Sequence, residues 1–91
     1  MLKSDLIEKV SKELEMNHDM TQLVVNTIFD AMTDALAKGE SIEIRGFGSF
    51  TVRHYPGREG RNPKTGESVT VDPRKKPFFK VGKELKNRVN S

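Results

Sequence analysis

The sequence predicts an α+β fold, in which an N-terminal helical hairpin is followed by a β-hairpin, a protruding two-stranded β-arm, a short strand and a short C-terminal helix. Three observations predict it. Apolar residues recur at helical spacing as far as Gly39, they alternate with polar residues from Ile42 to Val52, and residues 54–76 have few sizeable apolar side chains. With 91 residues, the chain has room for one small domain, residues 1–91. Only 34% of its residues are hydrophobic, which is few for a stable core in a chain of this length.

The helical hairpin is expected within residues 1–39. Ser4 is placed to cap a first helix that runs to about Glu15, because Leu6, Val10 and Leu14 lie on one helical stripe. A second helix is expected between Asn17, a good capping residue, and Gly39, which is typical of the position after a helix. Its apolar stripe consists of Met20, Val24, Val25, Ile28, Phe29, Met32, Ala35 and Leu36.

After Gly39 the spacing of the apolar residues changes from that of a helix to that of a strand, in which every second residue is apolar. Residues 40–53 predict a β-hairpin, in which Gly46-Phe47-Gly48 reverses the chain. Residues 77–81 predict a short apolar strand, and residues 82–91 predict a short helix with Leu85 and Val89 on one face. No internal repeat is present.

The intervening residues 54–76 cannot form a packed core, because Tyr55, Val69 and Val71 are their only sizeable apolar side chains. The turn signal of residues 62–66, followed by alternation around Val69, predicts an arm of two strands, each about eight residues and roughly 26 Å long. A disordered loop is the alternative.

Charge is distributed unevenly along the chain. Residues 1–40 hold four basic and eight acidic side chains, a net charge of −4, whereas residues 41–91 hold twelve basic and five acidic ones, a net charge of +7. The second half is therefore expected to bind a polyanion, although a basic surface can also serve solubility alone.

The sequence argues against catalysis, metal binding and cofactor binding. It has no cysteine, its two histidines His18 and His54 lack metal-ligand spacing, and no glycine-rich phosphate loop precedes a helix. No long apolar segment is present, so we expect an unexported cytoplasmic protein without a membrane or small-molecule partner.

The arm offers the chemistry of DNA binding. Its basic side chains can bind phosphate groups and donate hydrogen bonds to the floor of a DNA groove. These residues are Arg53, Arg58, Arg61, Lys64, Arg74, Lys75 and Lys76. Pro63 lies at its expected tip, where it either shapes the turn or acts as a rigid apolar wedge that lacks an N–H group.

Three segments, residues 42–50, 60–66 and 77–86, strongly resemble the bacterial HU and integration host factor family, and the resemblance extends over essentially the whole chain. It implies an intertwined dimer, in which the helices and three-stranded sheets share one core and two β-arms wrap duplex DNA. Minor-groove binders of this kind insert apolar wedges between base steps. The apolar residues that we assign to the dimer core are Val24, Ile28, Phe29, Met32, Leu36, Phe47, Phe50 and Phe79.

The resemblance also implies roles for individual residues. Pro63 would intercalate, and the residues expected to line the minor groove beside it are Arg58, Arg61, Asn62 and Lys64. The residues expected to hold phosphates along the arm and sheet are Arg53, Arg74, Lys75, Lys76 and Lys80. Further phosphates would lie at helix N-termini, near Lys3 and Ser4 and near Gly82, Lys83 and Lys86. Arg45, followed by Gly46, resembles the β-subunit type of integration host factor, in which the equivalent arginine reaches the minor groove.

The function expected is that of an architectural protein of the bacterial nucleoid, which binds the minor groove, bends DNA and assists packaging, transcription, replication or recombination. Tyr55-Pro56 departs from the charged residue more usual at the base of the arm. An HU-like homodimer and a host-factor-like subunit with a different partner both fit the chain. An adaptor that binds RNA or an acidic protein through the basic arm is the alternative function, although the arm offers only Tyr55 as an aromatic platform.

Overall fold

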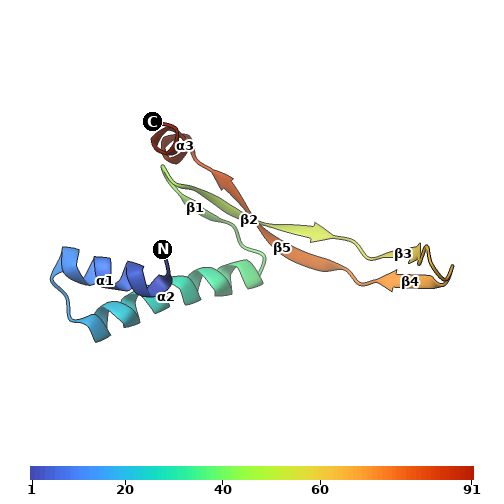
Figure 1. The fold of residues 1–91 in the computed structure, drawn as a ribbon, viewed down its shortest axis with the longest axis horizontal. Helices are drawn as coiled ribbons and strands as arrows, with labels where there is room; N and C mark the ends of the chain where they lie inside the picture. Colours follow the sequence, from blue (N-terminus) through green and yellow to red (C-terminus); the bar gives the residue numbers. More distant parts are fainter. The chain divides into compact units, whose positions relative to one another are not determined.

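The computed structural model describes all residues from 1 to 91 and divides them into two compact units, residues 1–34 and 35–91. The first unit contains α1 (Lys3–Leu14) and most of α2 (His18–Ala37). The second contains β1 (Ile42–Ile44), β2 (Gly48–Tyr55), β3 (Arg58–Arg61), β4 (Ser68–Val71), β5 (Arg74–Val81) and α3 (Lys83–Val89) (Figure 1). The predicted α+β fold is therefore confirmed, whereas the assignment of residues 1–91 to a single domain stays a prediction.

The start of α1 differs from the expectation. Leu2, not Ser4, is the capping residue, and Ser4 lies inside the first helical turn. The carboxylate of Asp5 accepts a hydrogen bond of 2.7 Å from the Leu2 N–H, so it takes over the capping role that we expected of the Ser4 hydroxyl. The helix ends at Leu14, and the capping residue that follows it, Glu15, adopts the left-handed conformation with a φ of 52°.

The start of α2 agrees with the sequence. The Asn17 side-chain oxygen accepts hydrogen bonds from the N–H groups of Asp19 and Met20, at 2.7 and 3.3 Å. Its end also agrees, because the Gly39 N–H donates to the Leu36 carbonyl. No helix in the chain has both the length and the apolar character needed to cross a membrane.

The single chain has very little core. Ile7 and Val25 are its only buried large apolar side chains, at 3% and 5% exposure, and both belong to the helical hairpin. The Lys3 ammonium group donates a hydrogen bond of 2.9 Å to the Asn26 side chain and so also joins α1 to α2. Burial within one chain is too small to account for its folding, since apolar burial is the main favourable contribution to folding.

The sheet is antiparallel, with the strand order β1-β2-β5. Ile42 pairs with Phe50 in β1 and β2, and Phe50 pairs with Phe79 in β2 and β5. The Phe50 and Phe79 rings are 4.8 Å apart and Phe47 is 5.7 Å from Phe79, so the three rings form one aromatic cluster. Pro77 is accommodated because β5 is an edge strand in the single chain.

The arm is a paired hairpin, in agreement with the prediction and not with the alternative of a disordered loop. Its strands, β3 and β4, continue beyond the ends of β2 and β5 in Figure 1. Two boundaries differ from the expectation: β2 extends to Tyr55, and β5 begins at Arg74, before the expected residue 77. Each predicted eight-residue arm strand is also interrupted, because Pro56 and Pro73 have no N–H group to donate to the ladder.

Candidate nucleic-acid interface

The tip of the arm is a turn held by its own hydrogen bonds. The Asn62 N–H donates to the Glu67 carbonyl at 2.8 Å, and the Asn62 carbonyl accepts from the Gly66 N–H at 2.7 Å. The Asn62 side-chain oxygen also accepts from the Lys64 N–H at 2.9 Å. Asn62 is half-buried and Pro63 is exposed. The turn therefore presents the Pro63 ring to solvent, while its hydrogen bonds are made by other residues.

Cations lie on both faces of the arm. Arg58 pairs with Val71 and Arg61 pairs with Ser68. Because successive side chains of a strand point to opposite faces, Arg58 and Arg61, three positions apart, lie on opposite faces. Lys64 adds a third exposed cation at the tip. An anionic groove that enclosed the arm would meet positive charge on both of its walls.

Four further cations lie on one face of the sheet. Arg53 pairs with Lys76, Tyr55 with Arg74 and Ser49 with Lys80, so these side chains share a face. The Arg53 guanidinium carbon is 3.4 Å from the centroid of the Phe78 ring, a cation–π contact that holds the side chain against the sheet. The face therefore presents the predicted cations Arg53, Arg74, Lys76 and Lys80 together.

Lys75 lies on the other face of β5, together with its cross-strand partner His54. Its ammonium group donates a hydrogen bond of 3.1 Å to the carbonyl of Ala37, the last residue of α2. A cation at this position is favoured by the partial negative charge at the helix C-terminus. The structure thus separates Lys75 from the other cations that we expected to hold phosphates.

We expect the two neighbouring lysines to differ in mutants. Lys75→Met should lower the free energy of unfolding by about 0.3–1 kcal/mol, because the helix loses its C-terminal cation, and should leave the salt dependence of DNA binding unchanged. Lys76→Met should instead make the log–log salt slope shallower by about 1 for each phosphate that the side chain neutralises. Thermal unfolding and binding titrations at several salt concentrations would measure both. A shallower slope for Lys75→Met would return Lys75 to the phosphate-binding set.

Arg45 lies in the tight turn between β1 and β2 and is exposed. The turn is attached to the start of α3, since the Gly46 carbonyl accepts from the Leu85 N–H at 3.1 Å and the Phe47 carbonyl accepts from the Gly82 N–H at 2.9 Å. Gly46 has a φ of 83°, and a Cβ there would lie 2.6 Å from a carboxylate oxygen of Glu84. The Glu84 side chain is flexible and could move away, so glycine is favoured here by the left-handed backbone conformation.

The predicted residues near the helix N-termini fall into both units. Lys83 and Lys86 are exposed on α3, which Gly82 precedes as its capping residue. Lys3 and Ser4 belong to the first turn of α1, where the Asp5 carboxylate already accepts from the Leu2 N–H. That carboxylate, which the prediction overlooked, places a negative charge at the proposed phosphate site.

Most basic side chains have no acidic partner. The chain contains one ion pair between Lys or Arg and a carboxylate, Lys12–Glu8 at 3.4 Å, and one His18–Asp19 contact at 4.0 Å. Of the sixteen Lys and Arg residues, only Lys12 is paired in this way. Residues 41–91 have a net charge of +7 and none of their cations is held in an ion pair, so the arm, sheet and α3 together exert a net positive field.

Comparison with known proteins assigns this fold and charge pattern to a family. Residues 1–90 match the family described as bacterial DNA-binding protein. The chain belongs to the bacterial HU and integration host factor family. Members of this family are architectural, non-enzymatic proteins that bind and bend DNA.

Individual family members cover nearly the whole chain. The integration host factor subunit beta of Alkalilimnicola ehrlichii is 51% identical over 92 aligned positions, which cover 100% of this chain and 92% of that protein. The cocrystal structure of Anabaena HU with DNA has a TM-score of 0.82 at 30% identity, covering 98% of this chain and 97% of that one. A mutant of Thermotoga maritima HU has a TM-score of 0.72 at 38% identity, covering 98% and 99%.

Proposed function

We propose that the arm of this HU and integration host factor family member enters the minor groove of duplex DNA, where Pro63 intercalates and bends the duplex. The observation that carries the proposal is the unpaired charge: only Lys12, outside the arm and sheet, has a carboxylate partner among the Lys and Arg residues. A cation without an internal partner keeps its full attraction for phosphate. The exposed Pro63 ring adds an apolar wedge at the tip of the arm.

The contacts are divided between groove and backbone. The residues that line the minor groove are Arg45, Gly46, Arg58, Arg61, Asn62 and Lys64. The residues that contact phosphates are Lys3, Ser4, Arg53, Arg74, Lys76, Lys80, Lys83 and Lys86, and Lys75 belongs to this set only if its bond to Ala37 is exchanged for one to phosphate. Arginine suits the groove because its planar, forked donors fit between the walls.

The binding unit is a dimer, either of two identical chains or of this chain with a related subunit. Leu23, Ile28 and Phe29 on α2 are 61%, 53% and 42% exposed in the single chain. So much apolar surface on a helix requires a cover, and a core completed by a second copy would supply it. The aromatic cluster supports the same conclusion, because Phe47 and Phe79 are also partly exposed. Residues 1–91 then act as one domain that is complete only in the dimer.

The cellular setting follows from the partner. A bacterial protein of this family that binds and bends duplex DNA acts in the nucleoid, where it serves DNA packaging or the assembly of transcription, replication and recombination complexes. Arg45 is the residue that would add site selectivity, because an arginine in a narrow minor groove reads groove shape.

The salt dependence of DNA binding tests the proposal. A dimer that neutralises roughly 8 to 10 phosphates should give a slope of log Kobs against log salt of about −7 to −9. The measurement is a fluorescence anisotropy titration on a labelled duplex at four or more salt concentrations. A slope shallower than about −3 would mean that most of the named cations miss the backbone. Duplex RNA of equal length that competed as well as duplex DNA would favour the RNA-binding adaptor instead.

A further inference from the structure

Phe78 is an exposed aromatic residue on the basic face of the sheet. It lies between Lys76 and Lys80 along β5, and these three side chains share a face because alternate residues of a strand point the same way. Phe79 points to the opposite face, where its ring packs against Phe50 in the aromatic cluster. The Phe78 ring is 39% exposed and lies outside that cluster. Packing in the cluster therefore does not explain an aromatic ring among the cations.

The Arg53 side chain is stacked on the Phe78 ring. Its guanidinium carbon is 3.4 Å from the ring centroid, a separation at which an N–H group aimed at the ring would collide with it. The guanidinium plane therefore lies nearly parallel to the ring, and its N–H donors, which lie in that plane, point away from the ring face. No ion pair involves Arg53. The ring thus holds the side chain in one orientation, while its donors have no carboxylate partner.

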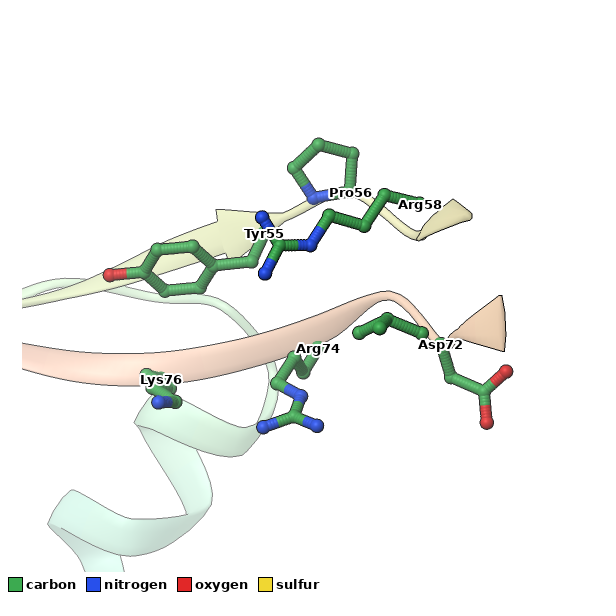
Figure 2. A pocket seen from close by; sticks show the side chains of 7 residues that line it. Tyr55, Pro56, Arg58, Asp72, Arg74 and Lys76 are labelled. Atoms are coloured by element: carbon green, nitrogen blue, oxygen red, sulfur yellow. The ribbon is translucent and has the colours of Figure 1, made fainter. Parts of the chain in front are cut away.

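The cations nearer the arm are held less closely. An open groove of about 470 Å³ lies beside Tyr55 at the base of the arm, and Arg58, Arg74 and Lys76 are among its lining residues. Figure 2 shows the Arg58 side chain extending back toward the Tyr55 ring, with Arg74 and Lys76 on the neighbouring strand. The Lys76 ammonium nitrogen is 5.8 Å from the Tyr55 ring centroid, near the limit of about 6 Å for a cation–π attraction. Arg53 is therefore the more tightly stacked of the two cations that lie over a ring.

We propose that Phe78 is a positioning residue for DNA binding, whose ring holds the Arg53 guanidinium ready to bind one phosphate group of the backbone. A long side chain that becomes ordered only on binding lowers the affinity by about two- to tenfold, because its rotamer freedom is lost in the complex. Arg53 has lost that freedom before DNA is bound, so binding does not carry this cost. Phe78 acts through Arg53 alone and does not itself contact DNA. The inference rests on the proposed function, because it requires the basic face of the sheet to contact DNA.

Nuclear magnetic resonance of the DNA-free protein tests the stacking. Protons that lie over the face of an aromatic ring are shifted upfield by its ring current, so the δ-methylene and Nε–H protons of Arg53 should resonate upfield of those of the other arginines. Phe78→Leu should abolish this shift, whereas Phe78→Tyr should retain it because the ring is kept. Thr51→Ala is the matched control, since it changes the cross-strand partner of Phe78 and leaves the ring in place. An Arg53 side chain without an upfield shift in the unsubstituted chain would overturn the proposal.

A double-mutant cycle tests the positioning role. Phe78→Leu should weaken the binding of the full chain to an intact duplex by about two- to tenfold for each copy of the chain, and Phe78→Tyr should restore the affinity. In a chain that already carries Arg53→Met, Phe78→Leu should cause no further loss, because Phe78 acts only through Arg53. Fluorescence anisotropy titrations of the four chains at one salt concentration measure the cycle.

The outcomes distinguish this inference from the proposed function. A loss of affinity from Phe78→Leu that persists in the Arg53→Met chain would mean that the ring contacts DNA directly or supports the sheet, and would overturn the positioning role. An affinity of Phe78→Leu equal to that of the parent chain would overturn it as well and would leave the proposed function intact. Absence of DNA binding by the unsubstituted chain would overturn both proposals.

Discussion

Ile28→Glu is expected to abolish the folded dimer. The Ile28 side chain is 53% exposed in the single chain and lies on the apolar stripe of α2 with Val24 and Met32. Burial against a partner stabilises an isoleucine by about 1.5–3 kcal/mol, and a carboxylate buried there without a partner costs several kcal/mol more. Because the total stability of a small domain is about 5–15 kcal/mol, the substitution removes most of it.

Analytical ultracentrifugation and circular dichroism measure this effect. The parent protein should sediment at twice the chain mass of 10.3 kDa and unfold cooperatively, whereas Ile28→Glu should lose both properties at micromolar concentration. Thr33→Glu is the matched control, because Thr33 is exposed on the same helix and lies outside that stripe. A parent chain that sedimented as a cooperatively folded monomer would contradict the dimer.

Pro63→Ala is expected to separate DNA bending from DNA binding. Insertion between base pairs costs a few kcal/mol of unstacking, which is offset by the additional contacts that a bent duplex allows. Without the wedge, the bend should become much smaller, while the cations still attract the backbone. The turn itself should persist, because its hydrogen bonds are made by Asn62, Lys64 and Gly66, and Pro63 has no N–H group to lose.

Energy transfer between the ends of a labelled duplex measures the bend. Pro63→Ala should reduce the transfer more than it reduces affinity at low salt, whereas Arg61→Ala should weaken binding with a shallower salt slope. On a nicked or pre-kinked duplex the Pro63→Ala defect should become smaller, because the unstacking has already taken place. If Pro63→Ala bends an intact duplex as fully as the parent does, Pro63 is a turn residue and not a wedge.

The sequence predicted the local features of the fold because short-range rules govern them. Asn17 and Gly39 mark the ends of α2 through hydrogen bonds within a few residues, and the turn at residues 62–66 forms in the same way. The alternation in residues 42–52 identified the hairpin. The prediction that Ser4 caps α1 was wrong for an equally local reason. Ser4 and Asp5 can both accept a hydrogen bond, and it is the Asp5 carboxylate that accepts one, from the Leu2 N–H.

Composition also led to two predictions, that a partner chain completes the core and that the binding surface is basic. Both follow from counts: apolar residues are too few to form a core in one chain, and the positive charge is concentrated after residue 40. Neither count could show how the cations are distributed over the molecule. From the sequence, the neighbouring residues Lys75 and Lys76 are equally good candidates for phosphate binding.

Only the tertiary structure decided which cations act together. The register of β2 with β5 places Arg53, Arg74 and Lys76 on one face and directs Lys75 to the C-terminus of α2. The same register places Pro56 opposite Pro73 and leaves the groove beside Tyr55. The physical reason is that pairing between strands joins residues about twenty positions apart, and a shift of one residue would turn every side chain to the other face. The sequence by itself therefore determined that the arm is basic and has a turn at its tip. The long-range pairing of strands determined the face on which each basic side chain lies.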